Sequence, residues 1–159
     1  MGTLGIVRIR KLVPVGLLGT AGILLFAQLM SVRRDNPPVA ADTAAPPKIE
    51  SVLRRACYDC HSNETRWPRY SAVAPFSWLI VHDVTLGRKE INFSEWGSYY
   101  PTTRHRKLQW MGRALREERM PPWSYRLMHP DARLTEGDRV ALQRWIESEL
   151  SNTSTQTPN

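Results

Sequence analysis

The sequence predicts an all-α fold: a small helical domain preceded by a single N-terminal transmembrane helix. Three observations support this prediction. Four segments repeat apolar residues at the three- and four-residue spacing of an amphipathic helix. No segment alternates apolar and polar residues convincingly, as a half-buried strand would. One further segment is uncharged and long enough to cross a membrane. A chain of 159 residues has room for one compact domain and such a segment.

The uncharged segment covers residues 12–32. About 20 helical residues, each rising 1.5 Å, match a hydrocarbon core about 30 Å thick. We therefore expect a cytoplasmic N-terminus at residues 1–11 and an uncleaved transmembrane anchor at residues 12–32. A cleaved signal peptide is the alternative. It is disfavoured because its best cleavage site, Val39-Ala40-Ala41, lies well beyond an apolar run that is itself longer than signal peptides need.

The anchor is followed by a Pro/Ala-rich linker at residues 33–47, which contains four prolines and four alanines. This composition buries no core, so we expect an extended tether. The domain is expected over residues 48–150, with long loops around 96–103 and 123–133. Residues 151–159 are polar and are expected to form a disordered tail.

Four helices are expected within the domain. Their apolar faces consist of Ile49, Val52, Leu53 and Ala56; Phe76, Leu79, Ile80 and Val84; Leu108, Met111 and Leu115; and Leu142, Trp145, Ile146 and Leu150. The first helix runs into Cys57, and the second ends near Gly87. The third is stopped by Pro121, because proline disfavours helix in the residue before it. The fourth opens with Thr135 and Asp138 in a near capping box.

Cys57, Cys60 and His61 form a CxxCH pattern, which is typical of covalent c-type haem attachment. If the preceding helix continues through the pattern, these three residues share one helix face. Two thiols can then form thioethers with the two vinyl groups while the imidazole ligates iron. We therefore expect one covalent haem c. The second ring nitrogen of such a histidine normally donates to an acceptor, and carbonyls near Pro68 or Pro75 are candidates.

Other uses of the two cysteines remain alternatives. A thioredoxin-like CxxC would follow a strand, whereas a helix is expected before Cys57. A zinc site needs four ligands, and beyond the pattern only His82, His105 and His129 are available. A disulfide is possible in an oxidising compartment. The CxxCH motif and its context together favour haem over all three alternatives.

Met120 is the expected sixth ligand, because cytochrome iron bound by histidine often takes methionine on its other side. It precedes two consecutive prolines, which fix two φ angles and stiffen the backbone around the sulfur. The alternative for Met120 is core filling. Met111 belongs to an apolar helix face and is expected in the core, while Met128 is a weaker rival. His82 would give a bis-histidine iron, but a surface position is favoured.

Several separated segments resemble the bacterial haem-binding domain family, which comprises small exported cytochrome-c-like monohaem proteins. The segments are CYDCHSNETRWP from residue 57, APFSWLIVHDVTLGRKEINFSEW from residue 74, MPPW from residue 120 and HPDARL from residue 129. The resemblance covers about residues 48–150. It implies a cytochrome-c-like helical domain with haem c on Cys57, Cys60 and His61, and it is consistent with Met120 as the distal ligand.

These features together predict an electron carrier with no catalytic residues. Thioether attachment is expected outside the bacterial cytoplasmic membrane, so the N-terminus lies inside and the haem domain in the periplasm. The expected partners are other redox proteins, and the N-terminal helix contacts the membrane. From residue 43 onward, 17 basic and 13 acidic residues leave too weak a charge for a nucleic-acid partner. The alternatives are a haem enzyme such as a peroxidase, or a haem-based redox or gas sensor with an open or labile sixth position.

Overall fold

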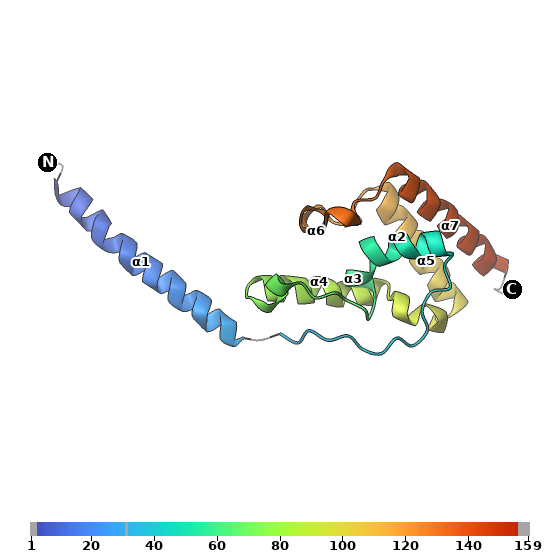
Figure 1. Cartoon of the computed structure of the whole chain (residues 1–159), viewed down its shortest axis with the longest axis horizontal. Helices are drawn as coiled ribbons and strands as arrows, with labels where there is room; N and C mark the ends of the chain where they lie inside the picture. Colours follow the sequence, from blue (N-terminus) through green and yellow to red (C-terminus); the bar gives the residue numbers. More distant parts are fainter. Residues whose placement is uncertain (1–2, 31, 156–159) are drawn as a thin grey trace. The chain divides into compact units, whose positions relative to one another are not determined.

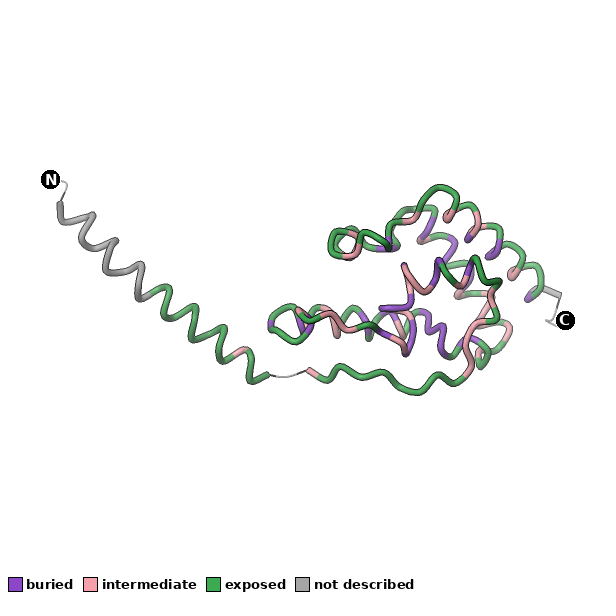
Figure 2. Tube along the Cα trace, in the orientation of Figure 1, coloured by how far each residue is buried: buried purple, intermediate pink, exposed green. Residues whose placement is uncertain are grey.

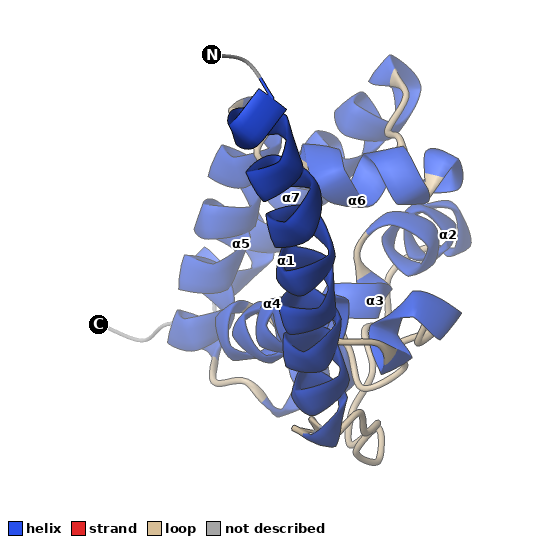
Figure 3. Cartoon of the chain, turned by 90° about the vertical axis from the view of Figure 1, so that its left-hand side faces the viewer, coloured by secondary structure: helices blue, strands red, loops and turns tan. Residues whose placement is uncertain are grey.

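The computed structural model describes residues 3–30 and 32–155, with side chains over 16–30 and 32–153. Within these residues the chain consists of helices and loops and has no strand, as Figure 3 shows. This confirms the predicted all-α class. The helices labelled in Figure 1, together with three short 3₁₀ helices, are α1 (Thr3–Leu29), α2 (Pro47–Ala56), α3 (Tyr58–His61), η1 (Arg69–Ala72), α4 (Phe76–Glu90), η2 (Phe93–Ser98), α5 (Pro101–Arg116), α6 (Trp123–Met128), η3 (Pro130–Ala132) and α7 (Glu136–Thr155).

The chain divides into two compact units, one of residues 1–34 with 68–82 and the other of residues 35–67 with 83–159. In the first unit, Gln28 near the end of α1 pairs with both backbone groups of Ala74. Its Nε2 donates to the Ala74 carbonyl at 3.2 Å, and its Oε1 accepts from the Ala74 amide at 3.0 Å. Trp78 Nε1 also donates to the Met30 carbonyl at 3.0 Å. These bonds join the end of α1 to the residues around the start of α4.

No helix in the part of the chain that the structure describes is both long enough and apolar enough to cross a membrane. The predicted span over residues 12–32 therefore gains no support from the structure. Residue 31 and the side chains of residues 12–15 lie outside the described residues.

The core of the second unit forms where α2, α5 and α7 meet η2. Its buried apolar residues include Ile49, Val52, Leu53, Phe93, Trp96, Leu108, Met111, Leu115, Leu142, Trp145 and Ile146. Helices α5 and α7 lie side by side (Figure 1, Figure 3), and the buried residues gather between the helices in Figure 2. Leu53, Leu108 and Leu142 are fully buried, and each such side chain contributes about 1.5–3 kcal/mol. The predicted apolar faces of α2, α5 and α7 are thus confirmed as core.

The predicted apolar face of α4 is wrong in part. Val84 is buried, but Phe76 and Leu79 are 56% and 60% exposed. Periodicity identifies which residues share a helix face, but it does not identify what covers that face.

Several element boundaries also differ from those predicted. Helix α5 begins at Pro101, inside the expected loop at 96–103, because proline suits the first turn of a helix. The expected loop at 123–133 contains α6 and η3, which are too short to show a period. Helix α7 continues to Thr155, so residues 151–155 of the predicted tail are helical; residues 156–159 lie outside the described residues.

Part of the predicted linker is attached to the domain. Residues 35–46, which we call the strap, are extended and lie along the second unit. The amides of Ala40 and Ala41 both donate to the Ser94 carbonyl at 3.0 Å, and the Gly97 amide donates to the Ala41 carbonyl at 3.0 Å. A segment without regular structure must satisfy its backbone groups elsewhere, and here it does so on η2. The strap is therefore a part of the domain.

Candidate functional site

The CxxCH residues occupy one turn, although not within a continuous helix. Helix α2 ends at Ala56, and Cys57 has φ −129° and ψ −38°, which breaks the predicted helix at the first cysteine. Helix α3 starts at the next residue. The His61 amide donates to the Cys57 carbonyl at 2.9 Å, which is the i to i+4 bond of an α-helix. The two cysteines and the histidine therefore lie within one turn, but the continuous helix on which the shared face was predicted is interrupted at Cys57.

The His61 ring is oriented by two carbonyls at the end of α4. Nδ1 lies 2.8 Å from the Gly87 oxygen and 3.1 Å from the Ile91 oxygen. Two acceptors at Nδ1 keep the ring proton there, so Nε2 carries the lone pair that a metal requires. Burial lowers the pKa of His61 and favours the neutral ring. The candidate acceptors near Pro68 and Pro75 are therefore wrong, because the end of α4 supplies the carbonyls.

Gly87 allows α4 to approach α3 this closely. A Cβ at residue 87 would stand 2.4 Å from the carbonyl oxygen of Cys60 and 2.9 Å from its carbonyl carbon. Both are backbone atoms, so no side-chain rotation relieves the clash. From the sequence alone, Gly87 is expected only as a helix end. A glycine within a helix lowers stability by about 1 kcal/mol relative to alanine. Its presence near the end of a helix therefore indicates a packing reason, such as the close approach of another backbone.

Both cysteines are half-buried and carry free thiols. Burial raises the pKa of each, to about 12, so both thiols are neutral at neutral pH. Among the described residues, no group of three or more histidine, cysteine, aspartate or glutamate side chains is arranged to hold a metal ion.

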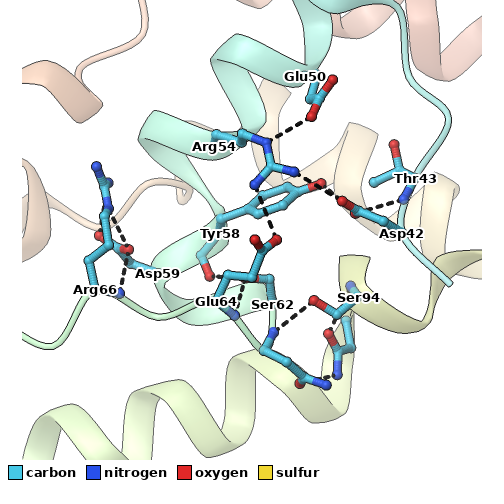
Figure 4. Close-up of polar contacts among 12 residues, drawn as sticks. Asp42, Thr43, Glu50, Arg54, Tyr58, Asp59, Ser62, Glu64, Arg66 and Ser94 are labelled. Atoms are coloured by element: carbon cyan, nitrogen blue, oxygen red, sulfur yellow. Dashed lines mark hydrogen bonds and ion pairs between the residues drawn. The ribbon is translucent and has the colours of Figure 1, made fainter. Parts of the chain in front are cut away.

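Tyr58, the residue after the first cysteine, is held from two sides. Its ring stacks on Phe93 with a centroid distance of 5.3 Å, and its hydroxyl donates to Asp42 of the strap at 2.8 Å. Arg54 lies over the same ring, 4.7 Å from its centroid. Figure 4 shows that Arg54 also pairs with three carboxylates, those of Asp42, Glu50 and Glu64. This cluster fixes the start of the CxxCH turn, residues 57–61, against the strap.

Two buried polar residues hold the other end of the turn. The Ser62 carbonyl accepts from Arg88 Nε at 2.8 Å. The Asn63 amide donates to Ser94 Oγ at 2.9 Å, and the Asn63 side chain accepts from Asn92 at 2.9 Å. Buried polar groups are costly unless they are paired, and these pairs join the turn to α4 and η2.

Asp59 lies between the two cysteines, and its side chain is only 10% exposed. Its carboxylate accepts from Arg66 Nε at 3.0 Å and from the hydroxyl of Tyr125 on α6 at 2.7 Å. Burial acts to raise the pKa of Asp59, but the hydrogen bonds from Arg66 and Tyr125 outweigh burial and lower it. Sequence reasoning missed this pair because nothing in a single sequence links residues 66 positions apart.

Met120 lies between α5 and α6. Its side chain is 39% exposed, so it does not fill the core. Met111 is buried in the core, as predicted. Met128 is 58% exposed, and His82 is also exposed.

Helix α6, which follows Met120, presents apolar side chains to solvent. All of its residues are described, and none is buried (Figure 2). Trp123 is 72% exposed and Leu127 is 62% exposed. Large exposed apolar side chains that cluster in this way mark a surface on which something binds. An apolar ligand bound at this surface would contact the apolar side chains of Trp123 and Leu127.

A family model described as a haem-binding domain matches residues 22–148. No curated protein and no solved structure matches the chain. The matched residues include Cys57, Cys60, His61 and Met120, and they make up most of the chain. The resemblance noted from the sequence is thereby confirmed, and the chain belongs to the haem-binding domain family.

Proposed function

We propose that this chain is a membrane-tethered, periplasmic monohaem c-type cytochrome that carries electrons between other redox proteins. His61 and Met120 ligate its iron, and Cys57 and Cys60 hold the haem by thioether bonds. The observation that carries the proposal is the orientation of His61. Its Nδ1 is bonded to the carbonyls of Gly87 and Ile91, within a turn that also supplies two free thiols.

The residues present fit a haem in three respects. The thiols of Cys57 and Cys60 are unpaired and lie on the same turn as His61. Nε2 of His61 retains its lone pair for iron. The exposed apolar side chains around α6 match the apolar faces of a porphyrin. When bound, haem supplies an iron atom that takes up and releases one electron.

The protein residues have separate tasks in this proposal. The carbonyls of Gly87 and Ile91 keep His61 in one orientation and increase the basicity of its Nε2. Met120 supplies a thioether, which favours a higher reduction potential than a second histidine would. Trp123 and Leu127 would supply apolar contacts to a bound haem and reduce its exposure to water. A closed, water-poor iron site favours electron transfer over the binding of small ligands.

Membrane tethering and export form the second part of the proposal. Residues 12–32 carry no charge, and the described side chains of α1 include exposed Leu17, Leu18, Leu25 and Phe26. Such side chains are stable in lipid. Residues 1–11 then lie in the cytoplasm and the haem domain lies in the periplasm. Membrane fractionation after a high-salt wash, combined with the N-terminal mass, tests this part. A soluble chain that starts near Ala41 would contradict an uncleaved anchor.

Optical spectroscopy of the haem-loaded chain tests the iron ligation. We expect low-spin iron with a methionine-to-ferric-iron band and no immediate binding of CO. Met120→Ala should lose the band and bind CO, whereas the matched control Met128→Ala should retain the wild-type spectrum. A wild-type protein that is high-spin and binds CO at once would contradict the proposal and favour a haem enzyme or sensor.

A further inference from the structure

We propose that the hydrogen bond between Tyr125 and Asp59 holds Met120 at the iron, which makes Tyr125 a positioning residue for the sixth ligand. This inference rests on the proposed function, because it requires Met120 to be that ligand. It extends the proposed function by connecting the turn that would hold the haem to the segment that carries Met120. Asp59 belongs to the turn that attaches the haem, and Tyr125 belongs to the helix that follows Met120.

The Asp59 end of this connection is fixed. Its backbone carbonyl accepts from Thr65 Oγ1 at 2.8 Å. Its carboxylate accepts from the Arg66 amide at 3.1 Å and from Arg66 Nε at 3.0 Å. Because the side chain is only 10% exposed, water competes little for these bonds. Asp59 thus presents a carboxylate oxygen in one place, one residue before Cys60.

The position of Tyr125, and with it that of α6, depends on its hydrogen bond to Asp59. Its hydroxyl donates to Asp59 at 2.7 Å, and its ring stacks on His129 with a centroid distance of 4.3 Å. Helix α6 has six residues, far fewer than an isolated helix needs for stability in water. None of these six residues, all of them described, is buried. Because so little of α6 is buried, its position depends largely on the hydrogen bond from Tyr125 to Asp59 of the CxxCH turn.

The position of Met120 depends on the position of α6, because a short and stiff segment connects them. Only Pro121 and Pro122 separate the methionine from the helix, and each proline ring fixes a φ angle. Pro121 is buried, and the Pro122 carbonyl accepts from the Arg126 amide at 3.0 Å inside α6. The Met120 side chain is 39% exposed, so its own burial does not hold it in place. Loss of the Tyr125 bond should therefore loosen the ligand.

The test measures competition for the iron in the full-length, haem-loaded protein. Exogenous imidazole binds ferric iron when Met120 leaves it, so its affinity reports how firmly the methionine is held. Tyr125→Phe removes only the hydroxyl, and we expect about tenfold tighter imidazole binding, since a hydrogen bond to a charged acceptor has about that effect. The matched control, Tyr100→Phe, changes a tyrosine that is 79% exposed and should leave the affinity unchanged.

A double-mutant cycle tests whether Tyr125 acts through Asp59. Asp59→Ala should also tighten imidazole binding, and the double variant should bind about as tightly as either single variant. Additive effects would overturn the inference. If Asp59→Ala fails to fold or to retain haem, Tyr125→Phe decides the question alone.

The outcomes separate this inference from the function on which it rests. If the wild type lacks the methionine band and Met120→Ala leaves imidazole binding unchanged, both are overturned. If the wild type and Met120→Ala behave as proposed but Tyr125→Phe keeps the wild-type band and affinity, only the inference is overturned. If Tyr125→Phe merely destabilises the fold, denaturant midpoints would change without a change in imidazole affinity, and that outcome also overturns the inference.

Discussion

A Cβ at Gly87 would stand 2.4 Å from the carbonyl oxygen of Cys60, so the close contact between α4 and the CxxCH turn exists only because residue 87 is glycine. The same approach brings the Gly87 carbonyl to 2.8 Å from His61 Nδ1. The packing of α4 and the orientation of the His61 ring therefore both depend on residue 87. A substitution there should affect both.

Gly87→Ala should lower the free energy of unfolding by about 1–3 kcal/mol, because the added methyl group forces two backbones apart. The His61 acceptor moves with α4, so the haem spectrum should change as well. Urea unfolding of the haem-loaded protein measures the first effect, and optical spectra of the iron measure the second.

Gly137→Ala is the matched control. The nearest atom to a Cβ at Gly137 is 3.8 Å away, which is an ordinary contact, and the residue lies in the first turn of α7. Replacing glycine in a helix by alanine should leave stability unchanged or raise it by up to about 1 kcal/mol. If Gly87→Ala is as stable as Gly137→Ala, the close approach of α4 is not as described.

The strap should contribute to the stability of the CxxCH turn through Asp42. Asp42→Ala removes the acceptor of the Tyr58 hydroxyl and one carboxylate partner of Arg54. We expect a loss of about 1–3 kcal/mol, the usual cost of leaving such groups without a partner. Denaturant unfolding should show little change for Asp131→Ala, because that residue is exposed. Equal stability of the two variants would refute a structural role for the strap.

Low pH should lower the free energy of unfolding by protonating Asp138, which lies at the start of α7. Burial acts to raise the pKa of Asp138, but hydrogen bonds from Thr135 and Arg55 outweigh burial and lower it from 3.8 to about 2. A carboxyl whose pKa is lower in the folded state stabilises the protein above its unfolded pKa. This contribution, roughly 2 kcal/mol, is therefore complete above about pH 5 and is lost as the pH falls from about 4 to 2.

The comparison with Asp138→Asn isolates this contribution. The difference in free energy of unfolding between the wild type and the variant should be largest near pH 6 and should shrink toward zero near pH 2. Urea titrations between pH 2 and pH 6 measure the difference. A difference that stays constant across this range would show that the charge of Asp138 is not responsible.

The apolar periodicity of the sequence was sufficient to predict the core of the domain. Leu53, Leu108 and Leu142 repeat with neighbours at helical spacing, and all three are fully buried. The capping box at Thr135 also formed, because its hydrogen bonds are local: the Asp138 amide donates to Thr135 Oγ1 at 3.1 Å. Helix α6 was missed because a helix of six residues is shorter than two turns and shows no measurable period.

The candidate site was predictable only where its chemistry is local in sequence. Cys57, Cys60 and His61 fall within five residues, so their spacing alone is enough to predict that they lie together in one turn. The carbonyl of Gly87, which orients His61, lies 26 residues away, and the Tyr125 partner of Asp59 lies 66 residues away. Such partners are brought together by packing between helices, which a single sequence does not record.

The proposed covalent attachment of haem to Cys57 and Cys60 is tested most directly by the mass of the denatured full-length protein. After extraction with acidic acetone, the chain should retain the mass of one haem. The variant that lacks both cysteines, Cys57→Ala with Cys60→Ala, should lose it. A wild-type chain that returns to its bare mass would contradict thioether attachment at Cys57 and Cys60.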